Sequence, residues 1–305
     1  MKISDSLISS CSGLGDIRVR SWEPENEPVG ILQIAHGVAE HVERYDDFAV
    51  FLVEKGWKVV AGDHLGHGKS APDTKGWFGE KNGWFNVVGD LKQIYDGNYV
   101  DGIPYFILGH SMGSFLLRTY LTVYPDARLS GAIISGTAWQ PGGILKAGIA
   151  MCNIQKAIKG SDKVSEMINN MAFGAYNNKI ENPKSKNDWL SRREDIVAQY
   201  DEDPLCGFSM TVGLAKDMFS GIAFNQKAEN LLKMNKDIPV FFIAGDMDPV
   251  GDYGKGVVTA KDAFVSAGMN SVDIKLYPDG RHEMLNETNY RDVYNDLYIW
   301  LESKK

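Results

Sequence analysis

The segment FILGHSMGSF, residues 106–115, decides how the rest of the sequence is interpreted. An apolar run ends at Leu108, and Ser111 then stands between two glycines in Gly-His-Ser-Met-Gly, residues 109–113. A Gly-x-Ser-x-Gly motif is short enough to occur by chance, so its context has to support it. If a buried strand ends here and a helix begins, small residues on either side allow a sharp turn that lifts the serine hydroxyl clear of the sheet.

The flanking sequence predicts such a sheet. Six short apolar runs bounded by Gly, Pro or Asp have the length and composition of strands buried on both faces. They lie at 30–36, 57–63, 104–110, 130–136, 238–246 and 272–280, and helix-length patterns occur at 44–56, 114–126 and 287–305. Alternation of strands and helices predicts an α/β fold with a mostly parallel, doubly wound sheet.

The alternation breaks between about Thr137 and Leu214, where the sequence is helical in character. One helix face there carries an apolar stripe that is too apolar to be left in water, made of Ile144, Ala147, Met151, Ile154 and Ile158. We therefore expect a core formed by residues 1–136 and 215–305, with a helical cap inserted at 137–214.

Composition and charge exclude several classes of protein. The 305 residues are 44% hydrophobic and 24% charged, as in an ordinary globular protein, and the net charge of -8 disfavours a nucleic-acid partner. Cys11, Cys152 and Cys206 are widely spaced, which predicts neither a disulfide framework nor a thiolate zinc site. With no apolar segment of transmembrane length and no signal-peptide pattern, we expect a cytoplasmic protein.

A serine hydroxyl becomes a good nucleophile only beside a base that an acid orients. Among the six histidines, His282 lies just past the last expected strand, where the chain order serine, acid, histidine requires the base. The acid should follow the preceding strand, in FFIAGDMDPVG, which offers Asp246 and Asp248. We favour Asp248 because the proline after it restrains the backbone, and we expect Asp246 to cap or hydrogen-bond the loop.

Acyl transfer also needs hydrogen-bond donors directed at the oxyanion. The N–H of Met112, after the nucleophile, is one candidate, and the N–H of Val38, after the first buried strand, is the other. The pair His64 and His67 lacks an obvious third ligand, so we predict that these side chains brace their loop and that the protein uses no metal or organic cofactor.

Five ordered motifs resemble the monoglyceride lipase and lysophospholipase (serine aminopeptidase-like) branch of the α/β-hydrolases. They are HGVAEHVERY (36–45), GDHLGHGKS (62–70), GHSMGS (109–114), GDMDPVG (245–251) and RHEMLNE (281–287), and they span nearly the whole chain. The segment 188–208 is similar to the end of the cap in bacterial members. This resemblance implies an α/β-hydrolase fold with an inserted helical cap.

The resemblance also implies roles for individual residues. Ser111, Asp248 and His282 fall on the family's triad, and Val38 and Met112 on its oxyanion hole. Three further positions match the polar end of the family's pocket, where a glycerol-like leaving group would bind: Glu40, Arg44 and Tyr200. Leu285 departs from the pattern, since mammalian monoglyceride lipases have a second histidine there, so the resemblance implies ester hydrolysis more strongly than it implies glycerol recognition.

We therefore expect a serine esterase acting on a small single-chain acyl ester, either a monoacylglycerol or a lysophospholipid. Met151 and Ile154 of the cap stripe are expected to line the acyl tunnel, and the cap could make transient contact with a lipid surface. An aminopeptidase or an acyltransferase with the same triad is the alternative enzyme, and a catalytically silent binding protein on this fold is the alternative outside enzymes. The sequence does not indicate the oligomeric state.

Overall fold

The computed structural model describes residues 1–70 and 74–305. Its centre is an eight-stranded sheet in the order β1-β2-β4-β3-β5-β6-β7-β8. The strands are β1 (Lys2–Ser9), β2 (Asp16–Glu23), β3 (Ile31–Ala35), β4 (Lys58–Gly62), β5 (Tyr105–His110), β6 (Gly131–Ser135), β7 (Val240–Gly245) and β8 (Val272–Tyr277). Strands β3 to β8 run parallel, whereas β1 and β2 pair antiparallel.

All six predicted strands are present, and the prediction of a doubly wound parallel sheet is confirmed. The antiparallel pair β1 and β2 was not predicted. β1 has no apolar run, because it is a largely exposed edge strand whose Leu7 is 66% exposed. Its pattern therefore lacks the burial signal that identifies a central strand.

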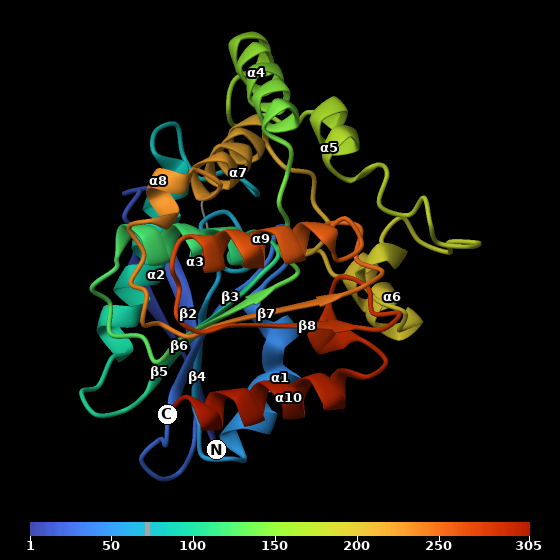
Figure 1. Ribbon diagram of the computed structural model, residues 1–305. Helices are drawn as coiled ribbons and strands as arrows, with labels where there is room; N and C mark the ends of the chain where they lie inside the picture. The colour runs from blue at the N-terminus through green and yellow to red at the C-terminus, as the bar shows by residue number, and fades with distance from the viewer. Residues whose placement is uncertain (71–73) are drawn as a thin grey trace.

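Helices cover both faces of the sheet (Figure 1). One face carries α1 (Asp46–Val53) and α10 (Tyr290–Ser303), and the other carries α2 (Gly83–Asn98), α3 (Met112–Val123) and α9 (Lys255–Ser266). Each layer buries its own apolar cluster against the sheet. The carboxyl ends of the parallel strands are left for loops, and ligands of open α/β sheets bind at this edge.

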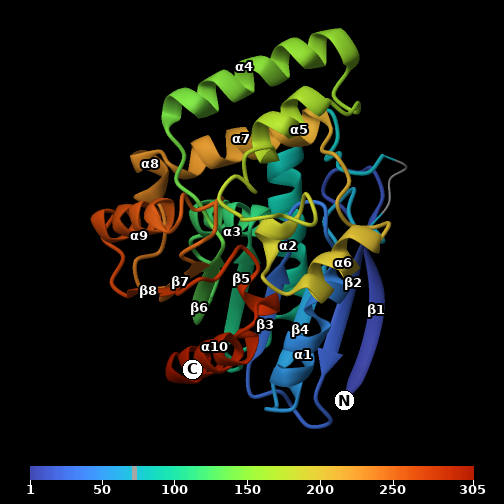
Figure 2. The ribbon, with the colours of Figure 1, turned by 90° about the vertical axis from the view of Figure 1, so that its right-hand side faces the viewer.

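The remaining helices lie between β6 and β7 and cover that edge (Figure 2). They are α4 (Gly142–Lys159), α5 (Glu166–Phe173), α6 (Glu194–Glu202), α7 (Val212–Asn225) and α8 (Ala228–Leu231), with a short 3-10 turn at Asp188–Leu190. The predicted cap, residues 137–214, contains α4, α5 and α6, and its predicted end falls within α7. We keep the name cap segment for residues 137–214.

The apolar stripe of α4 does not pack as expected. Ile144, Ile154 and Ile158 are 62%, 54% and 70% exposed, and Met151 is only partly buried. The helix instead packs on α7 through another face, on which Leu145 and Cys152 are buried and Gly148 lies against the ring of Phe219. Because Gly148 has no side chain, α7 can approach α4 closely on this face. The face of α4 that carries the bulkier isoleucines is left exposed.

The start of α3 lies so close to β3 and to the end of β5 that two positions cannot carry a side chain. A Cβ atom at Gly113 would overlap the carbonyl oxygen of Ala35, and a Cβ atom at Gly109 would overlap the backbone of Gly113. Both glycines of the Gly-x-Ser-x-Gly motif are therefore required by packing.

We predict opposite effects of alanine at two helical glycines. Gly113→Ala must push α3 away from β3, and we expect it to lower the free energy of unfolding by at least about 2 kcal/mol. Gly97→Ala, in α2, meets no atom within 4 Å and should raise it by about 0.5 kcal/mol, since alanine is the better helix former. Urea unfolding of both variants tests this, and equal stabilities would contradict the packing argument.

Candidate active site

Ser111 lies in the sharp turn between β5 and α3. Its backbone has φ 53° and ψ -119°, a conformation that non-glycine residues rarely adopt. The turn is held by the N–H of Ser111, which donates to Ser135 O at 3.0 Å, and by the hydroxyl of Ser114, which donates to Ser111 O at 2.6 Å. Strain of this kind persists where the surrounding structure imposes it, and it is concentrated at functional sites.

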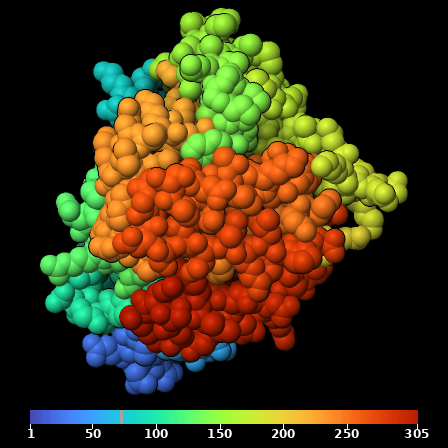
Figure 3. Space-filling model, viewed as in Figure 1, coloured from blue at the N-terminus to red at the C-terminus, as the bar shows by residue number. Residues whose placement is uncertain are grey.

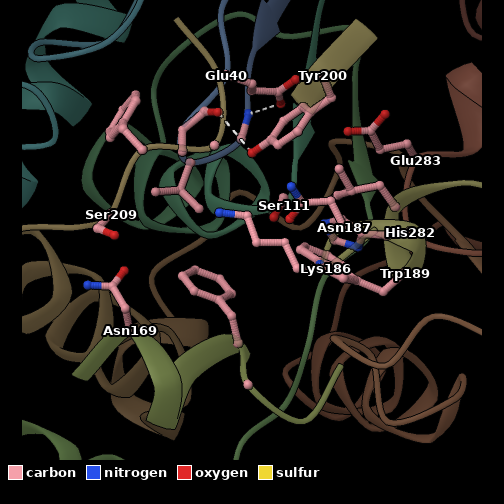
Figure 4. Close-up of a pocket in the computed structure, with 18 of the residues that line it drawn as sticks. Glu40, Ser111, Asn169, Lys186, Asn187, Trp189, Tyr200, Ser209, His282 and Glu283 are labelled. Atoms are coloured by element: carbon pink, nitrogen blue, oxygen red, sulfur yellow. Dashed lines mark hydrogen bonds between the residues drawn. The ribbon is translucent and has the colours of Figure 1, made fainter. Parts of the chain in front are cut away.

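His282 and Asp248 form a buried pair near this turn. Nδ1 of His282 lies 2.9 Å from Oδ2 of Asp248, whose other oxygen accepts the N–H of Val250 at 2.9 Å. The side chains of His282 and Ser111 border the same cavity (Figure 4). Nε2 of His282 is buried and has no hydrogen-bond partner within residues 1–70 and 74–305. The imidazole is thus anchored at one nitrogen, and the other is available to take a proton.

Asp246, the alternative acid, does not contact His282. Its backbone N–H donates to Tyr277 O at 3.1 Å, while its Oδ1 finds no hydrogen-bond partner in the described part of the chain. The carboxylate therefore does not make the loop hydrogen bond that we expected of it. The geometry favours Asp248 as the residue that orients the imidazole.

The charge of Asp248 controls the pKa of His282. Complete burial alone would lower the pKa of the imidazole, but the adjacent Asp248 carboxylate stabilises the charged form, and the net effect is a raised pKa. In contrast, His110, next to Ser111, has its pKa lowered to about 4 by burial and by His282. At neutral pH His110 is uncharged, which leaves His282 as the candidate base.

The two proposed oxyanion donors flank Ser111. Val38 lines the cavity, and Met112 is the first residue of α3, where a helix leaves its N–H groups without intrahelical acceptors. Gly37 keeps the Val38 loop close, since a Cβ atom there would lie 2.7 Å from Oε1 of Glu40 and 3.1 Å from Cβ of Ser111. The site can therefore present two backbone donors and a helix N-terminus to developing negative charge.

Glu40 and Arg44 belong to a buried ionic network beside these loops. Glu40 accepts the N–H of Gly37 at 2.5 Å and a hydrogen bond from Arg44 at 2.8 Å. Arg44 also binds both oxygens of Glu283, each at 2.6 Å. The network joins the Val38 loop to the loop that carries His282.

The structure places the three residues predicted at the polar end of the pocket close together. Glu40 and Tyr200 line the cavity, and Tyr200 donates to Ala39 O at 3.0 Å while its ring lies 4.8 Å from the Arg44 guanidinium. Arg44 itself does not border the cavity, because its guanidinium is engaged by the two carboxylates. Arg44 therefore lies behind the cavity wall, where it binds Glu40 and Glu283.

The cavity has a volume of about 360 Å³ and lies between the strand ends and the cap segment. Met151 and Ile154 do not line it, because α4 stands on α7, away from Ser111. Sequence reasoning missed the cap residues that do, which include Asn169, Phe173, Lys186, Asn187, Trp189 and Leu190. The aromatic residues Phe173 and Trp189 were a possible signal, but no helical periodicity connects them.

The rings of three histidines, His36, His64 and His67, hold their loops together through hydrogen bonds to backbone groups. The N–H of His64 donates to Nε2 of His36 at 2.9 Å, and Nε2 of His64 lies 3.0 Å from His36 O. Nδ1 of His67 lies 3.1 Å from Leu65 O. Burial lowers the pKa of His64 to about 3 and that of His67 to about 4, so all this bracing is done by uncharged rings.

Comparison with known proteins agrees with the geometry. The chain is 28% identical over 303 residues to a monoacylglycerol lipase from Mycolicibacterium smegmatis, with 96% of each chain covered. It is 25% identical over 304 residues to the human monoglyceride lipase, over 93% of this chain and 86% of the human protein. A thermostable carboxyl esterase from Bacillus coagulans, solved in complex with glycerol, matches 99% of both chains with a TM-score of 0.90 and 32% identity.

An α/β-hydrolase fold with a serine in the turn after β5 and a buried imidazole–carboxylate pair beside it defines a serine hydrolase. Residues 26–289 match the family described as serine aminopeptidase, S33. The chain belongs to this family. Within the described residues, no helix is both long and apolar enough to cross a membrane.

We predict that Ser111→Ala removes ester turnover and leaves the fold intact. The hydroxyl is the only nucleophile in the strained turn, so turnover of an activated short-chain ester should fall by at least about 10⁴-fold, as triad removals do. A fluorophosphonate should label the native protein and not the variant. Near-normal turnover in a purified, cooperatively folding variant would exclude Ser111 as the nucleophile.

The two aspartates should differ sharply. Asp248→Asn removes the charge that holds the imidazole in its productive tautomer, and we expect kcat to fall by about 10⁴-fold. Asp246→Asn is the matched control and should keep most of the activity, since its carboxylate does not contact His282.

The pH dependence provides a second measurement on these variants. The base must be neutral, so kcat/KM should fall as the pH drops through the pKa of His282, which lies above its ordinary value of 6.5. In Asp248→Asn, burial remains without the compensating charge, and the acid limb should move to lower pH. An acid limb that moves only in Asp246→Asn would reverse the assignment.

Proposed function

We propose that the protein hydrolyses single-chain carboxylic esters, with monoacylglycerols or lysophospholipids as the substrate class. The observation that carries this proposal is the pairing of a strained Ser111 with the unpartnered Nε2 of His282 on one cavity. The two curated relatives, both named as monoacylglycerol lipases, and the Bacillus coagulans esterase support an ester as substrate. A cytoplasmic location, suggested by the three free cysteines, is part of the same proposal.

The reaction follows from the positions of these groups. Oγ of Ser111 attacks the ester carbonyl while Nε2 of His282 takes its proton, and the N–H groups of Val38 and Met112 stabilise the oxyanion. The imidazolium, stabilised by Asp248, then protonates the leaving alkoxide, which departs as the alcohol. Water attacks the acyl-enzyme by the same route, releasing the fatty acid and restoring Ser111.

The cavity walls fit an amphipathic ester. Phe173, Trp189 and Leu190 of the cap segment supply apolar surface, whereas Glu40 and Tyr200 lie at a polar part of the wall. Glycerol, present in the Bacillus coagulans complex, is the alcohol that a monoacylglycerol would release. Leu285, where mammalian enzymes have histidine, packs in the apolar cluster with α1 and α10, so recognition of a glycerol group here would depend on the Glu40 side.

A peptidase is the second candidate, because the family description is that of a serine aminopeptidase. An aminopeptidase needs a carboxylate with oxygens free to bind the substrate's α-amino group. The oxygens of Glu40 and Glu283 already accept hydrogen bonds from Gly37, Tyr45 and Arg44, although the single guanidinium leaves one net negative charge on the group. The lipase names of the two relatives favour the ester.

A panel of acyl esters, aminoacyl amides and alcohol acceptors separates esterase, peptidase and acyltransferase activity. A failure of fluorophosphonate to label Ser111 would indicate a silent binding protein.

Chain-length dependence tests the role of the cap segment. Each substrate methylene buried against Phe173 and Trp189 gains up to about 0.8 kcal/mol, so kcat/KM should rise with acyl length until the cavity is full. Phe173→Asp should flatten that rise while sparing an acetate ester. Leu232→Asp, at an exposed position that borders neither the cavity nor the isoleucine face of α4, is the matched control. Identical profiles in the native protein and Phe173→Asp would remove this wall from the specificity argument.

The exposed isoleucines of α4 support transient contact with a lipid surface. Ile144, Ile154 and Ile158 lie on one exposed face, and α4 forms an outer end of the molecule (Figure 3). Single exposed apolar residues are ordinary, but a row of them on one helix marks an interaction surface.

Replacing all three isoleucines with serine should weaken co-sedimentation with phosphatidylcholine vesicles severalfold, because the buried apolar area is lost. Hydrolysis of a soluble acetate ester serves as the control and should not change. Unaltered vesicle binding by the triple variant would show that α4 is not the contact surface.

A further inference from the structure

Although the sequence predicted no metal site, because Cys206 lies far from the other cysteines, the fold brings Cys206 beside His41 and Asp203. We propose that these three residues form a binding site for a thiophilic divalent cation such as Zn²⁺. One ligand atom from each side chain lies within 4.8 Å of the others. Nε2 of His41 is 2.8 Å from Oδ2 of Asp203, and all three residues are at least partly buried. An imidazole nitrogen, a carboxylate oxygen and a thiolate sulfur are the three donors that zinc prefers in proteins.

The imidazole of His41 is already oriented as a metal ligand. Nδ1 lies 2.7 Å from Oε2 of Glu43, and this contact directs Nε2 toward Asp203. Metal-binding histidines commonly donate their second N–H to a carboxylate in this way. Asp203 is also fixed, because its other oxygen accepts the N–H of Leu205 at 2.8 Å. The site thus has outer hydrogen bonds of the kind that stabilise a metal centre.

A groove provides an entrance. It has a volume of about 280 Å³ and borders His41 and Asp203, and its lining includes Glu43, Arg44, Asp46 and Asp47. Most of these charges are paired, Arg44 with Glu40 and Glu283, Glu43 with Arg18 and Lys69, and Asp46 with Arg20 at 3.5 Å. The groove therefore offers a cation a polar path to Asp203.

The three ligands come from two parts of the chain. His41 follows the Val38 loop, whereas Asp203 and Cys206 follow α6 at the end of the cap segment (Figure 2). These parts already touch, since the N–H of Gly207 donates to Ala39 O at 2.9 Å. Gly207 and Phe208, next to Cys206, line the catalytic cavity. A bound cation would therefore link this part of the cavity wall to the core through His41.

Cobalt(II) titration of the full chain tests the site, because thiolate coordination gives a charge-transfer band in the near ultraviolet. We expect this band in the native protein and its loss in Cys206→Ser. The double variant Cys11→Ser/Cys152→Ser keeps only Cys206 and should retain the band. Zn²⁺ at about a hundredfold excess over its Kd should raise Tm by about 3–5 °C in the native protein.

Further variants separate this site from a cation bound elsewhere. His41→Gln should abolish the Tm rise, and Glu43→Gln should weaken the affinity for Co²⁺ by about 10-fold through loss of the orienting carboxylate. Absence of the band in the native protein, or its persistence in Cys206→Ser, would overturn the proposal and leave His41 as an ion-pair partner of two carboxylates. If Cys206→Ser does not fold, the double variant decides, since loss of the band there would also overturn it.

Discussion

The contact between α3 and the end of β3 is the constraint on which the site depends. Because Gly113 packs against the carbonyl of Ala35, the helix that follows Ser111 begins directly beside the loop that carries Val38. Gly109, at the end of β5, has no room for a side chain because the backbone of Gly113 lies against it, and the chain turns between these glycines through the positive φ of Ser111. Ser111, the Val38 loop and the N-terminus of α3 are thus brought together by backbone packing rather than by side-chain contacts.

A second constraint, the ionic network around Arg44, fixes the positions of the surrounding loops relative to this turn. Arg44 pairs with Glu40 on one side and Glu283 on the other, and Tyr200 of α6 stacks over its guanidinium. Buried ion pairs add little net stability compared with apolar packing, but loss of one partner leaves an uncompensated charge. In this protein the ion pairs fix the positions of two loops. Glu40 accepts a hydrogen bond from the Gly37 amide, and Glu283 is the residue next to His282.

The features that the sequence predicted well are those set by local rules. Buried parallel strands are apolar throughout, a strand-to-helix serine turn needs glycines, and chain order separates His282 from the other histidines. The cap was predicted less well, because a helix has several faces and the stripe alone does not say which one packs. Gly148 against Phe219 decided the orientation of α4, and this long-range contact has no local signal. The exposed strand β1 was missed for the opposite reason, since it has little burial to detect.

The arrangement of the chain ends has a practical consequence. Both termini lie at the end of the molecule opposite α4, on the side of α1 and α10 (Figure 1). A surface or carrier attached through either terminus would hold the protein with its cap segment directed outward. Immobilised enzyme would then leave α4 and the rest of the cap segment free of the support, without the need for a long linker.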